Sequence, residues 1–347
     1  MYLISSSRTP YELSLQTHKM KSPLTGNEMT LLKEWRTMEY RKEKFEVMFH
    51  FYRCVDTGEQ FEDEQFSQLN FNQVINQYRV RHHIPFPEQI QKIRLKYELS
   101  ASKMSEILGL GVNSWRNYEG GEVPSTAIAS LIHTMANPEI FIQQIQLYSC
   151  LADKEKAKII KHVQKLITDS CCCDDPLYRF NNQPGITTGF KAFDRIKTEQ
   201  VISFFAERLQ PFKTKLNKLL FYTDFVNFRN TAQSITGLRY NAIQFGPVPY
   251  NYDILFGTLA DIDIIDIEYA MTPNGEVERI LPNPQNQFDA SLFSPTELEA
   301  MEYIANKFKV TSASDIADIS HREAAWKDNV DGKKIIPFTY AFVLETV

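Results

Sequence analysis

The period of the apolar pattern changes near Phe66, and this change constrains the fold more than any other feature of the sequence. In the segment KFEVMFHFYRC, from Lys44 to Cys54, alternate residues are apolar, which is typical of a β-strand with one buried face. Asp56-Thr57-Gly58 follows with residues that favour a turn. Beyond Phe66 the apolar residues recur at helical spacing. We therefore predict a small β unit followed by a long helical region.

The length of the chain indicates more than one domain, since 347 residues exceed what a single core usually covers. Hydrophobic residues make up 43%, enough for well-packed cores. We predict a multidomain, mainly α protein. Its expected parts are a disordered tail at 1–19 (for which a later start of translation is the alternative), a small β unit at 20–65, a helical bundle at 66–150, a helix and linker at 151–189, and a C-terminal α domain with a short β ribbon at 190–347.

The charge is distributed unevenly along the chain. Residues 1–189 hold 22 basic and 22 acidic side chains, whereas residues 190–347 hold 16 basic and 21 acidic ones. The second part therefore carries the whole net charge of -5. This balance excludes a polycation that coats nucleic acid, and it leaves room for a small DNA-reading module in the first part. The acidic second part is better suited to a protein partner.

Cysteine usage and hydropathy favour the cytoplasm. The five cysteines are odd in number and three are adjacent (Cys171 to Cys173), which makes a poor disulfide framework. No apolar run approaches the roughly 18 residues of a membrane span, and the first residues lack the apolar centre of a secretory signal. We expect a cytoplasmic protein with no membrane partner. The adjacent cysteines with His162 and Asp174 could hold a soft metal, but neighbouring thiolates converge poorly on one ion, so we predict no metal there.

Two short pairs in the β unit have the spacing of a zinc ribbon without its ligands. Ser22-x-x-Thr25 and Cys54-x-x-Thr57 are each followed by glycine, as in the paired turns that hold zinc. A hydroxyl is not a usable zinc ligand at neutral pH, so only one thiolate is left. We therefore predict a β hairpin that packs without metal, and no cofactor anywhere in the chain.

The segment from Pro87 to Ser125 contains the strongest local motif. Pro87 opens one helix, Ser100 is a good N-cap for a second, and glycines at 109 and 111 form a tight turn before a third helix at Val112–Tyr118. This order predicts a helix-turn-helix that reads the major groove. Seven basic against three acidic residues between 79 and 116 agree with a DNA-facing side; a bundle with a solvated polar face is the alternative. The candidate DNA-binding residues are Lys103, Asn113, Ser114, Arg116 and Asn117.

This segment resembles the Cro/repressor-type helix-turn-helix of the MqsA family of antitoxins. The resemblance is carried by IPFPEQI, SASKMSEILG, WRNYEGGE and the closing Pro124-Ser125. It implies that Arg116 and Asn117 lie on the recognition helix, and that a zinc domain precedes it. The sequence departs from the family there, because it cannot supply the four cysteines.

The pattern of residues 190–347 predicts helices around a short β ribbon. Ser234–Phe245 has the character of a strand or ribbon, and Gly246–Pro249 is expected to be a rigid turn because neither proline can donate to a ladder. Ser294-Pro295-Thr296-Glu297 has the signature of a capping box. The expected helices are Phe190–Glu207, Pro211–Val226, Tyr252–Ile264 and Ser294–Phe308, and before the linker Ser125–Met135, Pro138–Leu147 and Lys154–Ile167.

This part resembles the Panacea (SocA-like) domain. The cues, in order, are KLNKLLFYTDF at 215–225, SITGLRYNA at 234–242, FGPVP at 245–249 and SHREAAW at 320–326. The resemblance implies a helical domain with a small β insertion that neutralises toxins by direct contact. Such toxins include small alarmone-synthetase-like enzymes, and some SocA-like proteins instead deliver a toxin to a protease.

Aromatic residues gather around the ribbon, as expected of a binding surface. Most of them should belong to the core, whereas Arg239, Tyr250 and Tyr252 beside the prolines are expected at the surface. The candidate toxin-binding residues are Tyr222, Arg239, Tyr240, Tyr250 and Tyr252.

No catalytic motif is present in the sequence. His321 and Glu323 lie two residues apart without a nucleophile, and a histidine near Trp326 is expected to be packed. We therefore expect a non-enzymatic antitoxin of a bacterial type II toxin–antitoxin system. It would bind a protein toxin through its C-terminal domain and autorepress its operator DNA, for which a homodimer would suit a palindromic site. The alternatives are a transcriptional regulator with a ligand-sensing C-terminal domain, and a protease adaptor for a toxin.

Overall fold

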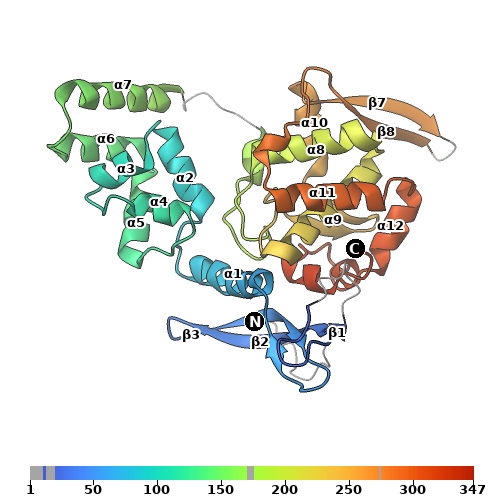
Figure 1. The fold of residues 1–347 in the computed structure, drawn as a ribbon. Helices are drawn as coiled ribbons and strands as arrows, with labels where there is room; N and C mark the ends of the chain where they lie inside the picture. The colour runs from blue at the N-terminus through green and yellow to red at the C-terminus, as the bar shows by residue number, and fades with distance from the viewer. Residues whose placement is uncertain (1–10, 13–19, 170–175, 273–274) are drawn as a thin grey trace. The chain divides into compact units, whose positions relative to one another are not determined.

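The computed structural model describes residues 11–12, 20–169, 176–272 and 275–347, and it is mainly α-helical with small antiparallel sheets (Figure 1). This confirms the predicted fold class. The predicted tail and the three adjacent cysteines lie outside the described residues, except for 11–12. The chain forms two compact units, one of Tyr78–Arg179 and one that joins the residues up to Gln77 with Phe180–Val347.

The N-terminal β unit is a four-stranded antiparallel sheet in the order β1-β2-β3-β4. Arg41 and Lys42, with φ of 48° and 67°, form the two-residue turn between its long strands. The free edge of β3 is covered by amide side chains of α1: the Asn70 amide bonds the N–H and C=O of His50, and the Gln73 amide bonds those of Met48. The elements are β1 (Tyr11–Glu12), β2 (Thr30–Tyr40), β3 (Glu43–Arg53), β4 (Gln60–Phe61) and α1 (Glu64–Arg81).

This sheet belongs to the same unit as the C-terminal helices, whereas the sequence-based division treats residues 20–65 as a separate part. The reason lies in direct contacts of its polar residues. Lys33 Nζ donates to the carbonyl of Phe342, and the ring of His50 lies 5.5 Å from that of Phe342. Asn76 Nδ2 donates to the carbonyl of Ala232 at 2.8 Å. The β unit and α1 thereby bind both the C-terminal segment and the end of a central helix.

The unit Tyr78–Arg179 is a bundle of short, capped helices. Ser100 and Ser125 accept hydrogen bonds from the first turns of α3 and α5, which confirms the predicted N-cap at Ser100. The core is built around Trp115 and the stacked rings of Tyr97 and Phe141, whose centroids are 4.0 Å apart. The helices are α2 (Pro87–Lys96), α3 (Ala101–Ile107), α4 (Ser114–Glu119), α5 (Thr126–Met135), α6 (Pro138–Leu147) and α7 (Asp153–Asp169).

The C-terminal part of the other unit is organised around α9, in which every residue from Lys215 to Arg229 is buried. Helices α8, α11 and α12 and the strand β6 pack around it. The short helix η2 (Pro176–Phe180) ends at the first residue of this part. Its further elements are α8 (Arg195–Leu209), α9 (Lys213–Thr231), β5 (Tyr240–Ile243), β6 (Gly246–Pro249), α10 (Tyr252–Asp261), β7 (Ile265–Thr272), β8 (Gly275–Pro282), η3 (Ala290–Leu292), α11 (Pro295–Lys307), α12 (Ala313–Arg322), α13 (Ala324–Lys327) and η4 (Phe338–Val343).

The prediction of a rigid turn at Gly246–Pro249 is wrong, because these residues form strand β6 opposite β5. The pairing tolerates the prolines because they lie opposite Ala242 and Tyr240. The N–H of Ala242 and the C=O of Tyr240 bond Lys334 and Ile336 instead, on the other side of β5. The backbone groups that face β5 therefore belong to Gly246 and Val248, which keep their N–H.

Other boundaries follow from local caps. Helix α8 begins later than predicted, because Asp194 caps it by accepting from Lys197 N. The predicted capping box is confirmed: Ser294 and Glu297 bond each other's backbone N–H at the start of α11. The β7–β8 hairpin and helices α12 and α13 have no counterpart among the sequence predictions.

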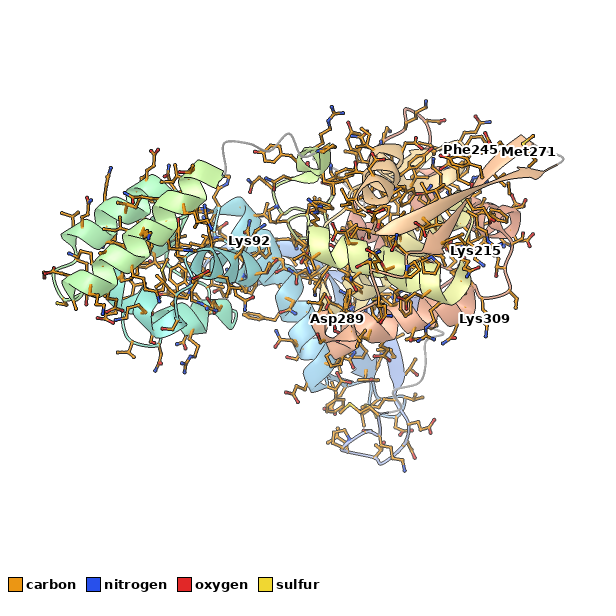
Figure 2. The ribbon with its side chains drawn as sticks, turned by 90° about the horizontal axis from the view of Figure 1, so that it is seen from above. Lys92, Lys215, Phe245, Met271, Asp289 and Lys309 are labelled. Carbon is orange, nitrogen blue, oxygen red and sulfur yellow. The ribbon has the colours of Figure 1, made fainter. Side chains whose placement is uncertain are left out.

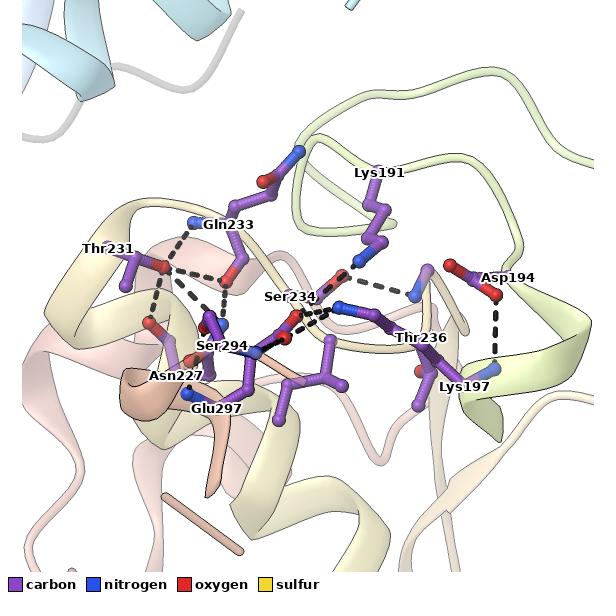
Figure 3. Close-up of polar contacts among 12 residues, drawn as sticks. Lys191, Asp194, Lys197, Asn227, Thr231, Gln233, Ser234, Thr236, Ser294 and Glu297 are labelled. Atoms are coloured by element: carbon purple, nitrogen blue, oxygen red, sulfur yellow. Dashed lines mark hydrogen bonds and ion pairs between the residues drawn. The ribbon is translucent and has the colours of Figure 1, made fainter. Parts of the chain in front are cut away.

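Glu297 also anchors α11 to the start of α8 and to the segment before it. Its carboxylate, 7% exposed, accepts from Lys197 Nζ and lies 3.7 Å from Lys191 Nζ (Figure 3). Ser294 N donates to the same carboxylate at 2.8 Å. The two lysines lower the pKa of Glu297 against the opposing effect of its burial. Asp194, whose charge also acts on Lys197, supplies the second acid of this cluster, which links α11 to the start of α8.

A single buried carboxylate fixes the segment after α9. Asp224, fully buried, accepts from the N–H groups of Ile235 (2.8 Å) and Thr236 (3.0 Å). It also accepts from the hydroxyls of Thr236 and Tyr240. The segment that leads into β5 lacks regular secondary structure, so this side chain satisfies backbone donors that would otherwise be unpaired.

We predict that Asp224→Asn lowers the free energy of unfolding by about 2–4 kcal/mol, because the amide turns one acceptor into a donor that faces other donors. Tyr240→Phe removes one donor without creating such a mismatch and should lower it by about 1 kcal/mol. Urea denaturation followed by circular dichroism measures both. Equal effects of the two substitutions would contradict the role given to Asp224.

We predict that acid destabilises the protein through His50. Burial lowers the pKa of His50 to about 4, with further contributions from the charges of Lys33 and Arg229. Between pH 6.5 and 4 the unfolded chain therefore binds a proton that the folded one does not, and stability falls as the pH falls. Relative to His50→Phe, the wild type should lose up to about 3 kcal/mol across this window. Parallel curves for the two proteins would show that His50 is not the cause.

Candidate functional site

Helices α3 and α4 are held against each other by Trp115. Its backbone N–H donates to Ser105 Oγ of α3 at 3.0 Å, and its indole N–H donates to Glu119 at 2.7 Å. The ring is fully buried. Gly109, with φ of 64°, provides the tight turn after α3. This packing fixes which side of the six-residue helix α4 faces solvent.

The structure places most of the predicted DNA-binding residues on that exposed side. Asn113, Arg116 and Asn117 are exposed, and Ser114 is partly exposed. Lys103 differs, because its ammonium pairs with Glu106 at 2.9 Å and with Glu155 at 3.4 Å. The hydrogen bond with Glu106 raises the pKa of Lys103.

The basic surplus of the segment 79–116 is smaller at the surface than in the sequence. Arg79 is buried and donates to the carbonyls of Pro85 and Gly121. Arg94 forms a two-pronged ion pair with Glu119, with distances of 2.6 and 2.9 Å. These two arginines therefore stabilise the bundle instead of facing a partner.

The four positions that correspond to zinc ligands converge in the β unit. The turns after Ser22 and Cys54 are closed by the N–H groups of the glycines that follow each pair. Thr25 Oγ1 lies 3.7 Å from Cys54 Sγ. Hydrogen bonds with Ser22 and Thr57 lower the pKa of Cys54 to about 6. Among the described residues no group of three metal-ligating side chains occurs.

Tyr222 and Tyr240, two of the predicted toxin-binding residues, are fully buried and cannot contact a partner. The hydroxyl of Tyr240 donates to Asp224 at 2.7 Å, and that of Tyr222 lies 3.4 Å from Glu323. The ring of Tyr222 stacks on Phe308 with centroids 5.1 Å apart, and the ring of Tyr240 packs against Phe221 of α9. Both side chains therefore belong to the core and not to a binding surface.

The other three candidates lie at or near the surface of the β5–β6 hairpin. The guanidinium of Arg239 stacks 4.9 Å from the ring of Tyr250, which is 37% exposed. Tyr252 is partly buried. At the tip of the hairpin Phe245 is 64% exposed (Figure 2). We call Arg239, Phe245, Tyr250 and Tyr252 the hairpin surface.

A half-open cavity of about 210 Å³ lies beside this surface, between α9, the hairpin and the start of α10. Its floor contains Lys218, which is fully buried and whose Nζ has no hydrogen-bond partner among the residues that the structure describes. The side-chain oxygen of Asn217 also has none. The residues that line the cavity are Lys213, Thr214, Asn217, Lys218, Ile243, Phe245, Val248 and Tyr252.

The hairpin can approach Lys218 only because residue 246 is glycine. Gly246 has φ of 97°, and a Cβ there would lie 2.6 Å from Lys218 Cε and 2.4 Å from Ser320 Oγ. Burial lowers the pKa of Lys218 to about 7. At the mouth, Lys213 pairs with Asp253 at 2.6 Å and with Glu278 at 3.0 Å.

His321 is a packed side chain, as expected from the sequence, and Glu323 is packed as well. The ring of His321 stacks 4.2 Å from Trp326, and Trp326 Nε1 donates to the carbonyl of Ile243. Burial and the charge of Lys218 lower the pKa of His321. Glu323 accepts from the N–H groups of Glu345 and Thr346, so it fixes the C-terminal segment.

Sequence reasoning missed Asn217 and Lys218 as site residues. The side chain of a lysine in a helix normally reaches solvent, so the sequence motif KLNKLLFYTDF does not by itself indicate a buried lysine. The available signal was position, since Lys218 lies between Leu216 and Leu219 in a helix that is apolar on several sides. Such a helix is buried all round, and its polar residues then require partners.

The part of the chain that the structure describes contains no helix that is both long and apolar enough to cross a membrane.

Residues 216–327 match the family model described as the antitoxin SocA-like, Panacea domain. This range begins at residue 216 of α9. It contains Lys218, Asp224 and the whole β5–β6 hairpin. No curated protein matches the chain. Residues 216–327 thus carry a Panacea domain of the SocA-like antitoxin type.

Proposed function

We propose that this protein is the antitoxin of a bacterial type II toxin–antitoxin system and that it neutralises a protein toxin by direct contact through the hairpin surface. The observation that carries the proposal is the match of residues 216–327 to the SocA-like Panacea domain. The described contacts of His321 and Glu323 are structural, since one stacks on Trp326 and the other accepts from a backbone N–H. A binding role is therefore better supported than a catalytic one.

The hairpin surface has the properties of a pre-organised contact. Two prolines stiffen β6, and Asp224 holds the segment that precedes β5. Binding would therefore order few residues, which favours affinity. Aromatic side chains and arginine are the residue types that dominate binding energies at protein interfaces, and the surface presents both in Phe245, Tyr250 and Arg239.

A second role, in DNA binding, is supported by α4. Asn113, Arg116 and Asn117 are exposed together on a short helix fixed by Trp115. These residue types suit base edges and phosphates, so we include autorepression of the toxin–antitoxin operon in the proposal. The structure favours this role less strongly than the sequence did, because Arg79, Arg94 and Lys103 are engaged within the bundle.

The cavity beside the hairpin favours one alternative function, that of a regulator whose C-terminal domain senses a small ligand. Small-molecule sites are concave, partly apolar and contain a few convergent polar groups, as this cavity does. Such a regulator would bind DNA but would not protect cells from a toxin.

We predict that co-expression of the full chain restores growth of cells that produce the toxin encoded beside its gene. Tyr250→Ala should weaken the complex about tenfold, because it removes a partly exposed aromatic anchor. Tyr178→Ala, which truncates a tyrosine that is 74% exposed elsewhere, is the matched control and should leave affinity unchanged. Continued growth arrest with the wild-type chain would refute the antitoxin proposal and favour the regulator.

We predict that Arg116→Ala and Asn117→Ala each weaken binding to the promoter of the operon by about 1–3 kcal/mol per lost base contact. The measurement is fluorescence anisotropy with promoter DNA at fixed salt concentration, since phosphate contacts depend on salt. Lys154→Ala, at an exposed position of α7, controls for the general loss of one charge. Unchanged affinity of both variants would remove α4 from the DNA-binding role.

A further inference from the structure

Lys218 is unlike the other buried lysines that the structure describes. Lys33 donates to a backbone carbonyl, Lys191 lies beside Glu297, and Lys215 donates to the carbonyl of Thr311 at 2.7 Å. Lys218, the most deeply buried of them, has no acceptor for its ammonium group. Buried cations are almost always paired, because an isolated charge is strongly disfavoured away from water. An unpaired one at the floor of a cavity indicates that its partner comes from another molecule.

The residues that line the cavity indicate which chemical group would pair with Lys218. The floor offers the N–H donors of Lys218 beside the side-chain oxygen of Asn217, an acceptor, whereas Ile243, Val248 and Tyr252 line the walls. An acceptor group on a short apolar stem matches this arrangement. The carboxylate of an aspartate or glutamate side chain has both parts, and its single negative charge would balance that of Lys218.

The mouth of the cavity argues against a multiply charged anion. Asp253 and Glu278 both lie within 3.0 Å of Lys213, so the cation at the entrance is already matched by two acids. A phosphate would meet these carboxylates on its way to Lys218, with repulsion for each of its charges. A protein side chain carries only one charge, and its backbone stays outside, where Phe245 offers an exposed apolar contact.

We propose that the cavity between α9 and the β5–β6 hairpin receives an acidic side chain of the toxin, whose carboxylate pairs with Lys218 while neighbouring apolar residues pack on Phe245. This inference rests on the proposed antitoxin function and names the chemistry of its contact. The glycine at 246 is part of the site, since any side chain there would displace Lys218 or Ser320. The unpaired lysine lowers the stability of the free protein and is compensated in the complex.

The test uses the full-length protein and the toxin encoded beside its gene, with the dissociation constant from calorimetry and the melting temperature of the free antitoxin. Lys218→Met keeps the length of the side chain and removes the unpaired cation, so the melting temperature should stay equal or rise. Affinity should fall about 30-fold or more, as for loss of one partner of a buried charge pair. Lys218→Gln serves as the second variant should the methionine variant not fold.

Lys215→Met is the matched control on the same helix. Its ammonium donates to the carbonyls of Thr311 and Lys309 and does not line the cavity. This variant should have a lower melting temperature and an affinity within threefold of the wild type. The two substitutions should therefore have opposite effects. Lys218→Met should weaken binding without loss of stability, and Lys215→Met should lower stability without loss of binding.

The outcomes separate the two proposals. Absence of any complex with the wild-type protein overturns the antitoxin function itself. A wild-type complex that Lys218→Met leaves intact, or a variant that loses stability and affinity together, overturns only the cavity site. Replacing each acidic residue of the toxin by its amide should reveal one whose effect is not additive with Lys218→Met. No such residue, or saturable binding of inorganic phosphate that depends on Lys218, would show that the carboxylate is not the occupant.

Discussion

The buried carboxylate of Asp224 is the interaction on which the C-terminal architecture depends. It accepts from four hydrogen-bond donors, three in the irregular segment between α9 and β5 and the fourth the hydroxyl of Tyr240 at the start of β5. Because that segment is fixed, the β5–β6 hairpin lies against α9 with Gly246 in direct contact with Lys218. One buried polar group therefore helps to hold the hairpin that covers Lys218.

Features with local causes could be predicted from the sequence. Ser100 and Ser294 cap helices through bonds to residues three positions away, so the pattern alone locates those helix starts. The alternation at Lys44–Cys54 likewise predicts β3. The strand at Gly246–Pro249 could not be predicted in this way, because the exclusion of proline applies only to N–H groups that face a partner strand, and that depends on register.

The candidate site was predictable only in part, for a related reason. A count of aromatic residues does not tell the covered from the exposed, so Tyr222 and Tyr240 were assigned with Tyr250 although they are fully buried. The burial of Lys218 could not be predicted, because α9 is enclosed by segments that are far apart in the sequence. Residues that act through their exposure or burial require the fold before they can be assigned.

The central claim is that the β5–β6 hairpin binds the toxin. Asp224 holds this hairpin over Lys218, whose ammonium group has no partner among the described residues. Hydrogen–deuterium exchange of the full chain with and without the toxin encoded beside its gene tests this claim most directly. The account predicts that residues 239–252 become more protected in the complex than the rest of the chain. Protection confined to other segments, with the hairpin exchanging as in the free protein, would contradict it.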